Sequence, residues 1–181
     1  NWFYFSSGSN KSGVIDATGR VLIPENQFDS IRLLPSTENN SAKLYENKAL
    51  HSALFGLRMV CEKKTADGKT ITIRNEKQAV TTFTLADDED WRFANVAYAI
   101  VISNKDVEKI YDINRKKVIL ELPAKELQQD ADGGFTQIKK IDDKKSLHTK
   151  FDRDGQPLAS LELPTGTYTT FSNQKQFITK Q

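Results

Sequence analysis

The sequence of 181 residues contains one cysteine and two histidines. A single thiol, Cys61, excludes an intrachain disulfide and a metal cage built from several thiolates. Apolar and charged residues alternate on both sides of Cys61, as in a half-buried strand, so we predict a buried structural thiol. We expect His51 and His148 to be solvated or to cap turns.

Long hydrophobic runs and an excess of charge of one sign are also missing. The longest apolar stretch, residues 96–102, has the length of a strand and is far shorter than the roughly 18–20 residues that cross a bilayer. The net charge is only +2, with 28% charged residues, which does not favour a nucleic-acid-binding surface. With 38% apolar residues, the chain is predicted to fold as one globular domain.

Catalytic and metal-binding motifs are not found either. The sequence has no Gly-x-Ser-x-Gly elbow, Walker loop or His-Glu-x-x-His pair. The strings that begin at Asp130 and Asp152 start like calcium loops, but their twelfth positions are Ile141 and Leu163 instead of glutamate. We therefore predict hairpin turns there, no cofactor, no metal and no enzyme activity.

The sequence consists mainly of short aromatic or β-branched segments that are separated by Ser, Asn, Asp and Gly. These turn residues tolerate a positive φ or bind their own backbone, so the pattern predicts antiparallel hairpins. The strands are predicted at residues 2–5, 13–16, 21–24, 54–60, 70–74, 79–83, 96–102, 107–111, 118–120, 135–141, 146–151, 158–163, 167–171 and 176–179.

The hairpins recur with a period of about 40 residues. Asp16, Asn75, Asp112 and Asp152 occupy equivalent turns, 59, 37 and 40 residues apart, and an insertion at 35–53 accounts for the longest interval. The predicted repeats are 2–34, 54–86, 96–123 and 135–164, with a partial copy at 167–180. We expect these four residues to stabilise turns through bonds between side chain and backbone.

The predicted fold is all-β: a single domain, 1–181, of repeated antiparallel meanders in a propeller-like or stacked array. The strand at 2–5 and the hairpin at 167–179 are predicted to complete one blade together. The alternative is an open stack whose ends are capped by the insertion. Helix is expected only at 42–50 and as a single turn at 124–129.

One segment resembles a known family. Residues 13–24, which run Gly-Val-Ile-Asp-Ala-Thr-Gly-Arg-Val-Leu-Ile-Pro, are followed by Phe28-Asp29-Ser30-Ile31 and resemble the WG (KWG) repeat of bacterial proteins. Ser12 stands where the family has its aromatic residue, and residues 110–119 and 150–158 keep only the general shape. The resemblance implies an all-β repeat domain, exported or surface-associated in bacteria, with no established chemistry.

An acidic segment is the candidate contact site for a partner. Asp87, Asp88, Glu89 and Asp90 precede Trp91 and Phe93. Aromatic side chains anchor interfaces while charges steer the encounter. A solvated loop, with Trp91 as a core anchor, is the alternative. Lysine pairs at strand ends are expected to discourage edge pairing.

Three classes of function remain open. The favoured one is a non-enzymatic protein-binding module of an exported bacterial protein, such as an immunity or envelope interaction protein, in the periplasm or cell envelope. The second is a glycan or small-molecule binding domain that uses Trp2, Tyr4, Trp91 or Tyr98, or a non-catalytic part of a larger enzyme. The third, an enzyme, would need acid–base groups that converge in a pocket. Because the chain starts at Asn1, we expect that a leader or anchor is absent from it; a cytoplasmic location is the alternative.

Overall fold

The protein is all-β and divides into two compact units, Asn1–Asp88 and Glu89–Gln181. The computed structural model describes residues 2–6, 12–33, 59–75, 77–94, 96, 98–130, 134–171 and 177–180, which contain no helix. The predicted fold class is therefore confirmed. The sequence predicts a single domain that contains both units. The boundary between the units lies between Asp88 and Glu89, inside the acidic segment.

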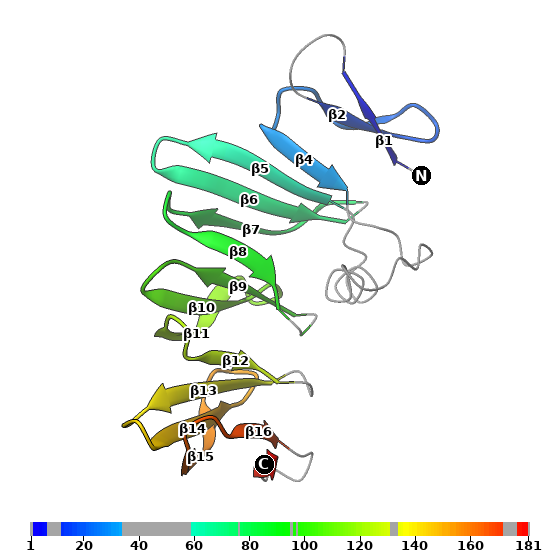
Figure 1. The fold of residues 1–181 in the computed structure, drawn as a ribbon. Helices are drawn as coiled ribbons and strands as arrows, with labels where there is room; N and C mark the ends of the chain where they lie inside the picture. Colours follow the sequence, from blue (N-terminus) through cyan, green and yellow to red (C-terminus); the bar gives the residue numbers. More distant parts are fainter. Residues whose placement is uncertain are drawn as a thin grey trace. The chain divides into compact units, whose positions relative to one another are not determined.

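The first unit contains two antiparallel sheets (Figure 1). The first sheet has the order β1-β2-β3, and the second has the order β4-β5-β6-β7. The strands are β1 (Trp2–Phe5), β2 (Gly13–Asp16), β3 (Val21–Ile23), β4 (Ser30–Leu33), β5 (Met59–Thr65), β6 (Gly68–Arg74) and β7 (Ala79–Leu85).

The second unit repeats this plan. The third sheet has the order β11-β10-β9-β8 and the fourth β12-β13-β14-β15, followed by the hairpin β16-β17. The strands are β8 (Asp90–Phe93), β9 (Ala99–Ser103), β10 (Val107–Asp112), β11 (Lys117–Pro123), β12 (Leu127–Gln129), β13 (Phe135–Lys140), β14 (Lys145–Phe151), β15 (Pro157–Pro164), β16 (Tyr168–Phe171) and β17 (Phe177–Lys180).

In each unit the core lies between neighbouring sheets. Val14 and Ile23 of the first sheet pack with Met59 and Cys61 of the second. In the second unit, Leu120 and Leu122 of the third sheet pack with Phe135 and Phe151 of the fourth. Each of these sheets therefore buries an apolar face against its neighbour within the unit, as expected for stacked repeats.

The single cysteine is part of this core. Cys61 is fully buried, and burial raises the pKa of its thiol to about 12. The thiolate, which is the reactive form, is therefore disfavoured at neutral pH. The prediction of a buried structural thiol is confirmed.

All four repeats share one turn. The side-chain Oδ1 of Asp16, Asn75, Asp112 and Asp152 accepts bonds from two backbone N–H groups further along the chain, at 2.8–3.1 Å. In each repeat, the two strands that the turn joins shift their pairing register. The shift lies between the two residues that come before the Asp or Asn. Turn chemistry at the four positions is confirmed, and it is local, as predicted.

One expectation about the elements is wrong. Residues 124–129 form no helical turn, because Leu127–Gln129 pairs with β13 as strand β12. Within the units, β1 pairs with β2 and β16 pairs with β17, and the blade shared by the two chain ends stays a prediction. The helix expected at 42–50 lies outside the described residues.

Each four-stranded sheet begins one strand earlier than its predicted repeat. The strands β4, β8 and β12 pair with the first strand of the hairpins that follow them. They are short, and all three lie outside the segments that the sequence predicts as strands. Pairing with a neighbour, more than intrinsic propensity, makes them strands.

Candidate functional site

The structure divides the acidic segment into exposed and engaged residues. Asp87, Asp88 and Asp90 are exposed. The Glu89 carboxylate is mostly covered and lies 2.6 Å from Lys109 Nζ of β10. The segment therefore carries less uncompensated negative charge than its sequence suggests.

The aromatic residues behind the segment pack against each other. The rings of Trp91 and Phe93 meet edge to face, with centroids 5.2 Å apart. Phe93 is buried and Trp91 is half-buried, while the Asp90 carboxylate accepts the backbone N–H of Trp91 at 2.8 Å. Of the predicted contact residues, Asp87, Asp88, Asp90 and part of Trp91 are presented to solvent.

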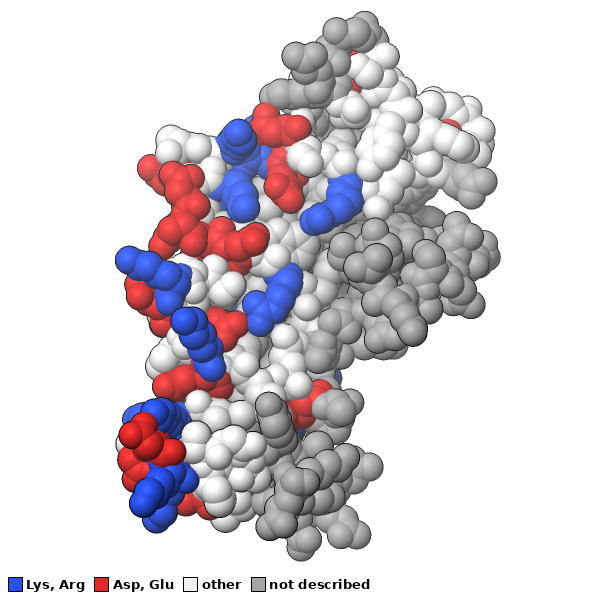
Figure 2. Space-filling view, viewed as in Figure 1, with Lys and Arg blue, Asp and Glu red and all other residues white. Residues whose placement is uncertain are grey.

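A shallow, open depression of about 280 Å³ lies in the first unit next to Asp87. Its lining combines two lysines with one aspartate: Lys64, Thr65, Ala66, Gly68, Lys69, Ala86 and Asp87. Figure 2 shows that positive and negative side chains are intermixed over the visible face. The lining of this depression favours neither a polyanion nor a polycation.

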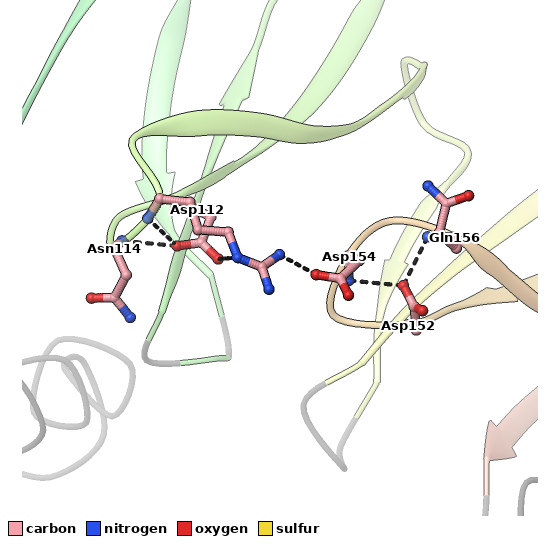
Figure 3. A network of polar contacts seen from close by, with 6 residues as sticks. Asp112, Asn114, Asp152, Asp154 and Gln156 are labelled. Atoms are coloured by element: carbon pink, nitrogen blue, oxygen red, sulfur yellow. Dashed lines mark hydrogen bonds and ion pairs between the residues drawn. The ribbon is translucent and has the colours of Figure 1, made fainter.

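A polar network joins two of the shared turns in the second unit (Figure 3). Arg115 follows Asp112 in its turn and forms an ion pair with Asp154 of the β14–β15 turn. The Arg115 Nε lies 3.8 Å from Asp112 Oδ2, which is buried without a hydrogen bond. The network therefore connects the third sheet to the fourth.

Tyr98 and Arg153 add an aromatic contact near the same turns. The Arg153 guanidinium lies 4.5 Å from the centroid of the Tyr98 ring. Burial raises the pKa of Tyr98 above its ordinary value. The arginine thus covers one side of this ring, while Trp2 is partly buried against the first core.

One face of β14, the face opposite Phe151, carries a buried row of polar side chains that sequence reasoning missed. Lys150 Nζ forms an ion pair with Asp130 Oδ2, and each side chain is less than 5% exposed. Thr136 Oγ1 donates to Asp130 Oδ2 at 2.7 Å, and Gln128 Nε2 donates to Asp130 Oδ1 at 2.9 Å. The hairpin turn predicted to begin at Asp130 is confirmed, because β12 and β13 pair antiparallel on either side of it and the Asp130 N–H donates to Gly134 O at 3.0 Å. The buried ion pair of its carboxylate was not foreseen, and residues 131–133 lie outside the described residues.

His148 belongs to the same row. It is 0% exposed, and its Nε2 lies 2.9 Å from Ser146 Oγ. The expectation that His148 is solvated or caps a turn is therefore wrong, while His51 lies outside the described residues. The two buried groups resemble part of a catalytic dyad, but a substrate reaches neither of them.

The buried imidazole predicts a pH-dependent stability. Burial lowers the pKa of His148 below its ordinary value of 6.5, so the unfolded chain binds the proton more readily than the folded one. The stabilisation is present above pH 6.5 and is lost as the pH falls below it, by at most about 1.4 kcal/mol per pH unit. Urea unfolding at pH 8, 7, 6 and 5.5 measures this loss.

His148→Gln provides the control for that experiment. Glutamine does not titrate, so the variant should lose most of the dependence between pH 7 and 5.5. An unchanged slope in this variant would assign the dependence to other groups.

Metal-binding and membrane-spanning features were also sought in the described part of the chain. No group of three or more His, Cys, Asp or Glu side chains there is placed to hold a metal ion. No helix among those residues has the length and hydropathy needed to cross a membrane.

Comparison with known proteins shows only weak likenesses. No protein-family model and no curated protein sequence matches the chain. A solved structure of a eukaryotic initiation factor is similar over 94% of this chain and 54% of its own, at 12% identity and a TM-score of 0.36. A protein of unknown function from Bacteroides caccae is similar over 97% and 63%, at 8% identity and a TM-score of 0.31. The chain thus spans between half and two thirds of these two proteins.

Proposed function

We propose that this chain is a non-enzymatic protein-binding module of an exported bacterial protein, acting in the periplasm or cell envelope as an immunity or envelope interaction protein does. The observation that carries the proposal is an exposed apolar face on the first sheet. Phe3 is 50% exposed and Val21 is 51% exposed. Exposed apolar patches on a protein surface mark interaction sites.

Cross-strand pairing aligns the apolar residues of this face in one row across the three strands. Phe3 pairs with Ile15, and Ile15 pairs with Val21, so all three side chains point to the same side of the sheet. Val14 and Ile23 point to the opposite side and are buried in the core. The first sheet is thus apolar on both faces, whereas a sheet with one solvated face is ordinarily polar on that face.

Capture from the envelope fraction of the native organism tests the proposal, with proteins identified by mass spectrometry. The wild-type chain should retain a stoichiometric partner that the Phe3→Ser/Val21→Ser variant loses. Val118→Ser/Leu158→Ser is the matched control, because Val118 and Leu158 are similarly exposed apolar residues outside this face. The purified partner must then bind the purified wild-type chain and the control variant, and lose binding to Phe3→Ser/Val21→Ser. The proposal would be refuted if the wild-type chain and both double variants retain the same partner, or if none of them retains one.

The acidic segment supports the same function by steering a basic partner. We expect Asp87→Asn/Asp88→Asn/Asp90→Asn to lower the association rate several-fold at low salt, with little effect near 0.5 M salt, because screening removes long-range attraction. Stopped-flow or surface binding of the captured partner measures the rate. Glu89 is left intact because it pairs with Lys109.

A matched triple variant serves as the comparison. Asp106, Glu121 and Glu162 are exposed carboxylates elsewhere, and their conversion to the amides removes the same charge. If both triple variants slow association equally, only net charge matters and the acidic segment has no special role.

A further inference from the structure

A lysine and an aspartate are in contact inside the second unit. Lys150 Nζ of β14 forms an ion pair with Asp130 Oδ2, one residue after β12, and the two side chains are 4% and 2% exposed. Thr136 of β13 stands directly opposite Lys150 in the pairing of these two strands. Because charged groups lose their solvation in such a place, the ionic state of the pair is less favoured over the neutral state than it is in water.

The two oxygens of the Asp130 carboxylate have different partners. Oδ2 accepts hydrogen bonds from Lys150 Nζ and from Thr136 Oγ1, the second at 2.7 Å. Oδ1 accepts a hydrogen bond from Gln128 Nε2 at 2.9 Å. The carboxyl carbon is therefore held one bond away from the oxygen that the lysine contacts, and the other donors fix its orientation.

An amine and a carboxylic acid that are held side by side are the reactants of amide formation. A proton transfer from Nζ to Oδ2 gives both neutral groups, and the amine then has the free electron pair that attacks the carboxyl carbon. Because the fold already positions the two groups, the reaction needs no bimolecular encounter. Burial also keeps away the bulk water that would hydrolyse the amide.

We propose that Lys150 and Asp130 form an intramolecular amide (isopeptide) bond, which makes this pair a self-modification site. The bond between Nζ and the carboxyl carbon forms, and the bond between that carbon and Oδ2 breaks. Two of the three protons of the ammonium group leave with Oδ2 as one water molecule, and the third stays on the amide nitrogen, so no co-reactant is needed. The ion pair is the reactant state, present in freshly prepared protein, and unfolding measurements on these two side chains refer to that state.

Gln128 and Thr136 are placed to assist this step. Negative charge develops on Oδ1 when the carboxyl carbon becomes tetrahedral, and the Gln128 Nε2–H group donates to that oxygen. The Thr136 hydroxyl donates to Oδ2, the oxygen that leaves as water, and is placed to pass the second proton from Nζ to it. The inference is independent of the proposed protein-binding function, because every group that it uses belongs to this chain.

Intact-mass spectrometry of the full chain during incubation at 37 °C tests the inference. The mass should fall by that of one water molecule. A tryptic digest should then contain residues 126–139 joined to residues 146–153, because an amide at Lys150 blocks cleavage after that residue. The exposed pair of Lys140 and Asp143 is the internal control: solvent keeps both groups charged, so we expect no link between them.

Two results of this experiment would overturn the inference. The first is an unchanged mass. The second is a loss of water without the joined peptide, because a succinimide at an Asp-Gly step such as Asp67-Gly68 also releases one water molecule.

Variants assign the roles in the reaction, with circular dichroism as the check that each variant folds. Lys150→Arg keeps a buried cation, but its guanidinium stays protonated and does not attack, so no joined peptide should form. Thr136→Val should slow formation of the joined peptide at least about tenfold, because the donor to the leaving oxygen is lost. Thr136→Ser keeps the hydroxyl and should react at nearly the wild-type rate.

The variants also have results that contradict the mechanism. A joined peptide in Lys150→Arg would overturn the assignment of the amine. Equal rates in Thr136→Val and Thr136→Ser would overturn the role of the hydroxyl.

Discussion

Replacing Lys150 with methionine should lower the free energy of unfolding by about 3–5 kcal/mol, because the change leaves the Asp130 carboxylate buried without its cation. Both side chains of the pair are almost fully covered. Thr136 and Gln128 still donate hydrogen bonds to the carboxylate, but neutral donors do not replace an ammonium group. Urea unfolding followed by circular dichroism measures the loss.

A double variant separates the charge effect from lost packing. Lys150→Met/Asp130→Asn removes both charges and keeps an acceptor for Thr136, so we expect it to recover much of the stability that Lys150→Met loses. Lys140→Met is the exposed control: Lys140 lies 2.5 Å from Asp143, but the pair is solvated and should contribute less than about 1 kcal/mol. A double variant as unstable as the sum of its single variants would contradict a coupled ion pair.

Alanine at Gly155 should destabilise the chain more than alanine at Gly19, although both glycines occupy the same position of the shared turn. Their φ angles are +77° and +83°, so each alanine pays for a left-handed conformation, about 1–2 kcal/mol. A Cβ at Gly155 would also lie 1.9 Å from the carbonyl oxygen of Ile119, whereas a Cβ at Gly19 meets nothing within 4 Å. The clash at Gly155 adds about 1–3 kcal/mol.

The comparison isolates the close approach of the third and fourth sheets, because the local turn is the same at both positions. Hydrogen exchange of the amides in each unit, together with urea unfolding, assigns the loss to the unit that carries the substitution. Equal losses in the two variants would mean that the contact between the Gly155 turn and Ile119 relaxes without cost.

The hairpins and their turns are properties of the sequence itself. Apolar and β-branched residues alternate with polar ones over lengths typical of strands, and Asp, Asn and Gly stand where the chain must reverse. The hydrogen bonds that form the shared turn span at most four residues. A short stretch of sequence therefore contains both the donors and the acceptor of each turn. That is why Asp16, Asn75, Asp112 and Asp152 were predicted correctly.

The first strands of the sheets and the buried polar row were decided by tertiary structure. The segments Asp90–Phe93 and Leu127–Gln129 are short and partly polar, and they become strands because a neighbouring strand pairs with them. In β14, the alternating pattern alone would place Leu147 inside and Lys150 outside. Burial of Lys150 requires Asp130, twenty residues earlier, and only folding brings the two together.

The candidate interaction surfaces also combine features that the sequence reveals with features that only the tertiary structure determines. The acidic segment is visible in the sequence, but the pairing of Glu89 with Lys109 is not, because the two residues are twenty positions apart, with strands β8 and β9 between them. Likewise, Phe3 resembles any aromatic residue of a strand until the register places it beside Ile15 on an exposed apolar face. Local chemistry determined the turns and strands of this protein, whereas the neighbours gained on folding decided which charges are neutralised and which apolar side chains stay exposed.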